Sequence, residues 1–181
     1  QARQVVDKII NYATNTKTLG DWRTNFSLVA DDEDGNLHLE DAELHANYLE
    51  TNFPEYNVEK IYFDSYRQQT TPGGNRYPDV NSAINSRVFA GNLVMNYVGH
   101  GGESGWAHER VLGTGDIASW TNYDKLPLFI TATCSFSRYD NPGLTSAGEV
   151  LITTPNGGSI GNVTTVRLVY ASSNQRMNED F

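Results

Sequence analysis

Leu126-Pro-Leu-Phe-Ile-Thr-Ala-Thr-Cys134 is the stretch that decides the fold, because this apolar, β-branched run ends at the only cysteine of the chain. A run of the same form lies upstream, Asn92-Leu-Val-Met-Asn-Tyr-Val-Gly-His100, and ends at a histidine flanked by glycines. Such runs are typical of buried strands in a parallel sheet. Two strands of that sheet would carry Cys134 and His100 out at the same carboxyl edge, where sites form in open α/β sheets.

A cysteine and a histidine at one sheet edge suggest nucleophilic catalysis, because a thiol needs a nearby base to become a thiolate at neutral pH. A lone cysteine is often a small buried hydrophobe instead, and a histidine beside glycine is often a turn residue. Here both residues end apolar runs, and small or polar residues follow both. Gly99 and Gly101, on either side of His100, would also let the backbone come close to a substrate. These features favour the catalytic interpretation over that of a buried cysteine and a turn histidine.

The other segments predict alternating strands and helices. We expect helices over residues 4–12, 39–53, 81–89 and 146–152, and strands over residues 26–30, 58–63, 93–98, 126–133 and 159–166. This order predicts an α/β fold with a mostly parallel sheet and helices on both faces. Residues 68–77 are expected to form a loop, residues 102–113 a substrate-flanking loop, and residues 177–181 the start of another helix. The chain then reads as a piece of a longer protein.

The composition argues against several classes of protein. The 181 residues are enough for one domain with a sizeable core. There are 22 acidic and 13 basic residues, giving a net charge of −9. This balance, without a basic patch, argues against nucleic-acid partners and anionic membrane surfaces. No apolar stretch reaches the roughly 18 residues of a transmembrane helix, and a single cysteine excludes an internal disulfide.

An acidic turn, Asp31-Asp-Glu-Asp34, follows the first expected strand and faces the same sheet edge. Three interpretations stay open for it. The turn is solvated, or it binds calcium, or one of its carboxylates orients His100 as the third member of a triad does.

Metal-ligand spacing in the chain is poor. Asp32-x-Asp34-x-Asn36 resembles an oxygen-ligand loop, but Gly35 falls at its fourth position, whereas an EF-hand needs glycine at the sixth. His38 and His45 lie seven residues apart, without a second histidine motif. We therefore expect no cofactor, and a structural calcium ion is the one metal left open.

Two motifs together resemble the gingipain-type cysteine peptidases of the caspase-like clan. Asn96-Tyr-Val-Gly-His100-Gly is similar to that family's Asn-Tyr-Thr-Gly-His-Gly, and Thr131-Ala-Thr-Cys134 is similar to its strand-borne catalytic cysteine. The histidine and the cysteine are 34 residues apart, and the resemblance runs almost end to end. Within the family, residues 99–112, 133–140 and 146–149 look closer to the PorU-type sortases of type IX secretion.

The resemblance implies a caspase-like three-layer sandwich over residues 21–181, with residues 1–20 as a linker helix entering from a preceding subdomain. It also implies that Cys134 is the nucleophile and His100 the general base and acid. The backbone N–H groups of Cys134 and Gly101 would form the oxyanion hole.

The family also has a carboxylate at the end of the first strand that orients the histidine. That place falls within Asp32-Glu33, and we take Asp32 first and Glu33 as its rival. Gingipains bind a basic P1 side chain with an aspartate whose matching position here is about His38. This departure predicts that the protein does not require arginine or lysine at P1.

The resemblance finally implies acyl transfer through a thioester. A sortase of this kind would cleave a carboxyl-terminal sorting domain from secreted proteins and could join the cargo to a surface lipopolysaccharide. Its partners would be substrates that carry the carboxyl-terminal signal domain, and other surface subunits of the secretion system. It would act at the bacterial cell surface, on the outer face of the outer membrane. Three alternatives are a gingipain-like secreted endopeptidase, a non-catalytic peptide-binding relative and, more weakly, a flavodoxin-like phosphate binder, whose phosphate the acidic turn would repel.

Overall fold

The computed structural model describes residues 1–181, and five parallel strands in the order β10-β9-β5-β1-β2 form its central sheet. Their bounds are β1 (Asn25–Ala30), β2 (Asn57–Tyr62), β5 (Val94–Val98), β9 (Leu128–Ala132) and β10 (Gly161–Thr164). The prediction of a parallel sheet is confirmed. The two apolar runs that end at His100 and Cys134 form β5 and β9, which are neighbours in the sheet.

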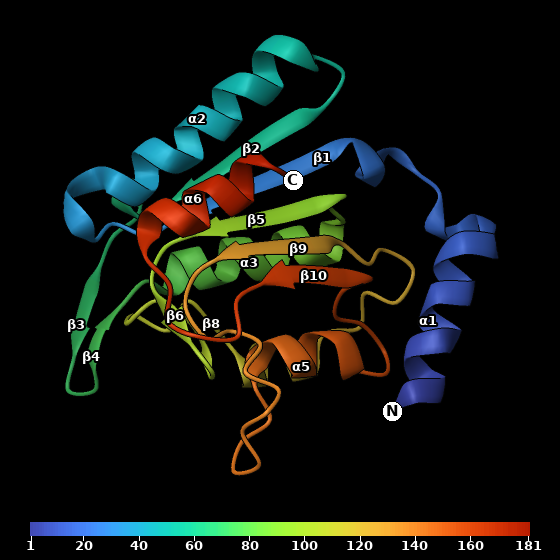
Figure 1. Ribbon diagram of the computed structural model, residues 1–181. Coiled ribbons are helices and arrows are strands. Elements are labelled where there is room, and N and C mark those ends of the chain that lie inside the picture. Colours follow the sequence, from blue (N-terminus) through green and yellow to red (C-terminus); the bar gives the residue numbers. More distant parts are fainter.

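Helices cover both faces of the sheet, so the fold has three layers (Figure 1). The helices α2 (Leu37–Asn52) and α6 (Ala171–Glu179) lie over one face, while α3 (Pro78–Ala90) and α5 (Ala147–Thr153) lie over the other. Each face of the sheet has its own hydrophobic core, and the side chains of β1 alternate between the two. Leu28 and Ala30 pack on the α2 side, and Val29 packs on the α3 side. Both faces of each central strand are buried, which explains why the strands read as continuous apolar runs.

The helix α1 (Ala2–Thr14) lies beside the sandwich and contacts it through a buried lysine. The Lys8 ammonium is held by two carbonyl oxygens near the end of α5, those of Thr154 at 3.3 Å and Gly157 at 2.9 Å. Burial lowers the pKa of Lys8 to about 8. The division of the chain at residue 20 stays a prediction.

Several small elements differ from the sequence-based prediction. The expected loop over residues 68–77 contains a hairpin, β3 (Gln69–Thr71) and β4 (Gly74–Arg76), which closes on Gly74 at φ 100°. The helix α3 begins at residue 78, three residues earlier than expected, because a proline is pre-organised for the first helical position. The substrate-flanking loop is paired into β6 (Gly101–Gly102), β7 (Gly105–Trp106) and β8 (Leu112–Gly113), and the short helix α4 (Thr114–Ser119) follows.

Residues 177–181 do not start a helix, and this expectation is wrong. They lie at the end of α6, whose first half is Ala-Ser-Ser-Asn-Gln and has almost no apolar periodicity. Its buried face is held by amides: Asn96 of β5 donates to Asn178 at 2.5 Å. Short 3-10 helices complete the chain at Thr16–Thr18, Asp21–Thr24, Asp34–Asn36 and Phe63–Ser65. None of the helices is both long and apolar enough to cross a membrane.

Candidate active site

The register of β5 and β9 brings His100 and Cys134 together at the carboxyl edge of the sheet. Val98 lies opposite Ala132 in the last strand pair, and the Gly99 N–H donates to the Ala132 carbonyl oxygen at 3.3 Å. His100 and Cys134 each follow that pair by two residues, and both line one cavity of about 220 Å³. The strand pattern predicted this juxtaposition.

Three hydrogen bonds fix the backbone of His100. Its N–H donates to Asp31 Oδ2 at 2.9 Å, and its carbonyl oxygen accepts from Tyr97 Oη at 2.6 Å and from the Ala107 N–H at 2.8 Å. Tyr97 is fully buried and stacks on Trp106, with ring centroids 4.3 Å apart. The position of His100 is therefore fixed by buried residues of the core and not by a free loop.

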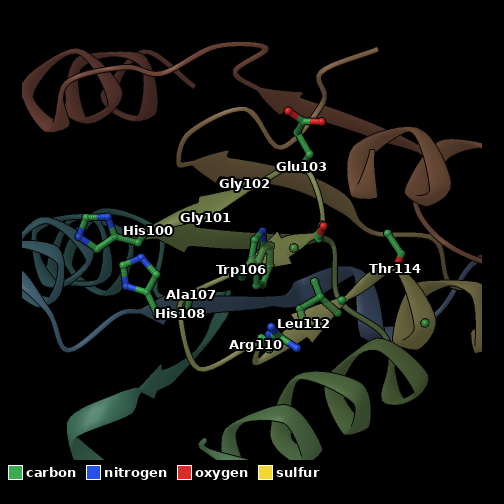
Figure 2. A pocket seen from close by; sticks show the side chains of 14 residues that line it. His100, Gly101, Gly102, Glu103, Trp106, Ala107, His108, Arg110, Leu112 and Thr114 are labelled. Atoms are coloured by element: carbon green, nitrogen blue, oxygen red, sulfur yellow. The ribbon is translucent and has the colours of Figure 1, made fainter. Parts of the chain in front are cut away.

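The imidazole of His100 contacts the acidic turn through one nitrogen. Its Nε2 lies 3.1 Å from Asp34 Oδ2 and 3.5 Å from Glu33 Oε2. The Glu33 carboxylate also lies 3.1 Å from His108 Nδ1 and raises the pKa of His108 through that hydrogen bond. Figure 2 shows His100 and His108 side by side at one end of a second, larger cavity.

The expectation that Asp32 contacts His100 is wrong. Asp32 Oδ2 accepts a hydrogen bond from Tyr77 Oη at 2.6 Å and so faces the start of α3. After Asp32 the chain turns, with Asp34 at φ 58°, and this turn presents Glu33 and Asp34 to the imidazole. The rival prediction of a Glu33 contact describes the geometry better, and Asp34, a residue we did not single out, is closer still.

Cys134 is half-buried, and its Sγ lies 3.6 Å from the Val169 carbonyl oxygen. The next residue, Ser135, has φ 53°, a left-handed conformation that is uncommon outside glycine. The Ser135 N–H donates to the Arg167 carbonyl oxygen at 3.1 Å, which holds the strained turn against the segment after β10. Strain of this kind persists only where the surrounding structure determines it.

The two N–H groups expected in the oxyanion hole have no backbone partner. The Cys134 N–H donates to no carbonyl oxygen. Because the Ala107 N–H donates to the His100 carbonyl oxygen, Gly101 and Trp106 form a non-hydrogen-bonded pair, so the Gly101 N–H points out of the β6–β7 ladder. Both N–H groups are therefore free to donate hydrogen bonds to a negatively charged oxygen.

The rest of the small cavity comes from α2 and from the start of α6. His38 and Asp41 of α2 line it, together with Tyr170, Ala171 and Asn174. His38 occupies the position expected for a carboxylate that binds a basic side chain, but Asp41, three residues later, places a carboxylate in the same cavity. Burial raises the pKa of Asp41, although the nearby His38 opposes that rise. The i, i+3 spacing of His38 and Asp41 on one helix was the available signal.

A second cavity of about 650 Å³ adjoins the first, and His100 lines both. Residues 101–108, 110 and 112–115 also line it (Figure 2). The substrate-flanking role of this loop stays a prediction. Glu103 in this loop lies 2.7 Å from Arg138 Nη1 and accepts from Asn141 Nδ2 at 2.6 Å. These contacts lower the pKa of Glu103 and join the loop to the segment after Cys134.

Three side chains that could ligate a metal ion come together from different parts of the sequence. One ligand atom each from Asp34, His38 and His100 lies within 4.8 Å of the other two. Histidine spacing along the chain did not predict this group. It coincides with the candidate base and its carboxylate, so a metal ion there would compete with proton transfer.

Comparisons with known proteins identify the family and the fold of the chain. The model of peptidase family C25 matches residues 1–181, and a search of the curated proteins found no match. The crystal structure of the Arg specific cysteine proteinase gingipain R is 21% identical with a TM-score of 0.78, over 98% of this chain and 40% of that chain. The complex of Porphyromonas gingivalis RgpB pro- and mature domains is 21% identical with a TM-score of 0.77, over 98% and 41%. The three-layer fold predicted from the resemblance is thus confirmed, and the chain spans about 40% of these solved chains.

Proposed function

The chain belongs to peptidase family C25, and from this premise we propose that it is a cysteine peptidase with Cys134 as nucleophile and His100 as base. The observation that carries the proposal is the strand register that brings both residues to one cavity. A half-buried thiol at a strand end, followed by a strained turn, is better suited to chemistry than to packing.

The geometry supports acyl transfer in two steps. His100 takes the Sγ proton, and the thiolate bonds to the scissile carbonyl carbon while the Cys134 and Gly101 N–H groups stabilise the oxyanion. The C–N bond then breaks, His100 returns the proton to the leaving amine, and a thioester stays on Cys134. Water or an amine next gives a proton to His100 and attacks the thioester, which releases the sulfur.

Asp34 and Glu33 are the proposed positioning residues for this histidine. Both carboxylates lie at Nε2, at 3.1 and 3.5 Å. The other ring nitrogen, Nδ1, is then the one available for the thiol proton. Carboxylates at Nε2 fix the tautomer and stabilise the imidazolium that forms during transfer.

At a finer level, we propose a PorU-type sortase that removes a carboxyl-terminal sorting domain from secreted cargo at the outer face of the outer membrane. The sequence likeness of residues 99–112 supports this choice, as does the arrangement of the two cavities. Because His100 lines both, an acyl acceptor in the larger cavity would meet the base on the side away from α2. An amine of a surface lipopolysaccharide is the proposed acceptor, and surface subunits of the secretion system are the proposed partners.

A gingipain-like endopeptidase is the second candidate, and one observation favours it. The Asp41 carboxylate lines the cavity that holds Cys134 and could pair with a basic P1 side chain. A buried lysine or arginine needs such a partner.

The test is labelling of the full chain with a series of peptide-based acylating probes that differ in their P1 residue, followed by mass mapping of the labelled residue. Labelling that maps to Cys134, that is lost in Cys134→Ala and that is kept in Ser135→Ala supports a peptidase. Absence of labelling at Cys134 in the wild type would indicate a non-catalytic relative. Incubation of a cargo peptide with a lipopolysaccharide amine then separates the two activities. An amide-linked product is expected of the sortase. Strict cleavage after arginine or lysine that Asp41→Asn abolishes would move the assignment to an endopeptidase.

A further inference from the structure

Glu103 connects two segments of the chain that each carry one donor of the proposed oxyanion hole. It follows Gly101 by two positions, and its partner Arg138 follows Cys134 by four. Glu103 Oε1 accepts a hydrogen bond from Arg138 Nη1 at 2.7 Å, and Glu103 Oε2 accepts one from Asn141 Nδ2 at 2.6 Å. The two halves of the hole, which come from different loops, are therefore joined by one carboxylate.

The half that carries Gly101 has little rigidity of its own. Residues 101–105 include three glycines, which lose more conformational freedom on folding than other residues do, and the strands β6 and β7 have only two residues each. The Glu103 carbonyl oxygen accepts from the Ala147 N–H at 2.7 Å, so both the backbone and the side chain of Glu103 are held. Figure 2 shows the Glu103 carboxylate pointing away from Trp106, outside the packed part of the loop.

The half that carries the nucleophile contains a strained turn. Ser135 has φ 53°, and the Arg138 N–H donates to the Ser135 carbonyl oxygen at 3.2 Å, which closes the turn. The side chain of the same arginine contacts Glu103. A second ion pair, in which Arg167 Nη1 donates to Asp140 Oδ1 at 2.9 Å, holds the turn against the segment after β10. Charged side chains from two other loops therefore fix this turn.

The position of the two N–H groups relative to each other decides what the hole can stabilise. Donors of an oxyanion hole act when they are fixed in advance, about 2.7–3.1 Å from the place of the charged oxygen. A displacement of about 1 Å at a reacting group can lower the rate by about 10²-fold. By contrast, the ion pair of Glu103 and Arg138, whose side chains are 20% and 43% exposed, contributes little to the stability of the fold. Loss of this ion pair should therefore alter the reaction much more than the folding.

We propose that Glu103, Arg138 and Asn141 form a brace that positions the Gly101 and Cys134 N–H groups relative to each other. The three are positioning residues, which act on the hole and not on the substrate. The inference rests on the proposed function, because the hole is needed only by a reaction that forms a charged tetrahedral oxygen. The brace should therefore assist the steps that form this oxyanion and leave the reactivity of the thiol itself unchanged.

The experiment compares two reactions of Cys134 in the full chain. In acylation by a peptide ester, whose P1 residue is the one that labels the wild type fastest, the thiolate adds to the carbonyl carbon, an oxyanion forms and the alcohol leaves. In alkylation by iodoacetamide the thiolate displaces iodide from a saturated carbon, so no oxyanion forms. Glu103→Ala should lower the maximal acylation rate by roughly tenfold, with little change in the half-saturating ester concentration. Its alkylation rate should stay within about twofold of the wild type, because the base is intact.

Further variants test whether the brace acts as a unit. Arg138→Ala should give the same split between the two reactions, and the double variant with Glu103→Ala should lose little more than the larger single effect, because partners of one contact are not additive. Glu103→Gln keeps an oxygen that can accept from Asn141 and should recover much of the acylation rate. Glu59→Ala is the matched control, since it breaks the ion pair of Glu59 with Arg87 on the edge strand β2 and should leave both reactions unchanged.

Equal acylation rates in the wild type, Glu103→Ala and Arg138→Ala would overturn the proposal. An alkylation rate that falls in parallel with acylation would also overturn it, because the carboxylate would then act on the thiol or on the fold. If Glu103→Ala does not fold, Arg138→Ala and Asn141→Ala provide the comparison with the same expected split. A wild type that is not acylated at Cys134 would instead reject the proposed function itself, and the brace with it.

Discussion

Replacing Gly99 by alanine should destabilise the protein strongly, because this residue has no room for a side chain. An added Cβ would lie 2.4 Å from Asp31 Cβ and 2.5 Å from Tyr97 Oη, and the backbone φ of 156° is rarely adopted by residues other than glycine. Asp31 and Tyr97 are both almost completely buried, so neither can move aside cheaply. Overpacking of this kind costs about 1–3 kcal/mol, and the unfavourable φ adds about 1 kcal/mol.

The expected loss in the free energy of unfolding is therefore about 3 kcal/mol. With a urea m-value of about 2–3 kcal/mol/M, the unfolding midpoint should fall by about 1–1.5 M urea. Gly102→Ala is the matched control, because its Cβ would meet nothing within 4 Å. It should change stability by no more than about 0.5 kcal/mol. Equal midpoints for the two variants would refute the reasoning that Gly99 is needed for close packing behind the histidine.

The other predictions concern the site and one buried charge. Cys134→Ala should abolish processing of a cargo peptide and change stability by only about 1 kcal/mol, and substrate turnover by this variant would rule out the nucleophile. His100→Ala should sharply slow iodoacetamide alkylation of Cys134 at pH 6, because the thiolate loses its base; equal rates would exclude His100. Asp34→Asn should lower kcat by about two- to tenfold with little change in KM, since the exposed contact at 3.1 Å is screened and worth about 0.5–1.4 kcal/mol. Asp32→Asn should leave kcat within about twofold, and the reverse order of effects would restore Asp32 as the positioning residue. Because the pKa of Lys8 is lowered to about 8, the unfolded state binds the additional proton above that pH. Wild-type stability should therefore rise from pH 8 to 10 relative to Lys8→Met, and parallel urea midpoints for the two proteins would contradict this.

The sheet could be predicted from the sequence because each central strand is buried on both faces. Val94–Val98 and Leu128–Ala132 are mostly apolar runs, each with one polar residue, and their carboxyl ends predicted the positions of His100 and Cys134. The small strands β6, β7 and β8 could not be predicted in the same way. They contain two residues each, mostly glycine, and tertiary pairing rather than periodicity holds them.

The carboxylate that contacts His100 was harder to predict than the histidine itself. Strand alternation correctly separates Asp31 from Asp32, but it does not say where the chain turns afterwards. The left-handed conformation of Asp34 decides that, and aspartate adopts it without a sequence signal as clear as glycine. The contribution of Tyr170 and Asn174 also depends on α6, a polar helix that apolar periodicity does not reveal.

The three hydrogen bonds to the backbone of His100 have a consequence for how the protein can diversify. One of these hydrogen bonds comes from the loop over residues 102–113, and its donor is a main-chain group, the Ala107 N–H. The other two involve the buried side chains of Asp31 and Tyr97. Apart from Trp106, which is buried and stacks on Tyr97, side chains of this loop can therefore be exchanged without displacing the histidine. Libraries that randomise Ser104, Arg110 and Thr114, which line the larger cavity, should yield altered acceptor preferences at a nearly constant rate of Cys134 acylation. In this architecture, selectivity can evolve at the rim while the reactive pair is inherited unchanged.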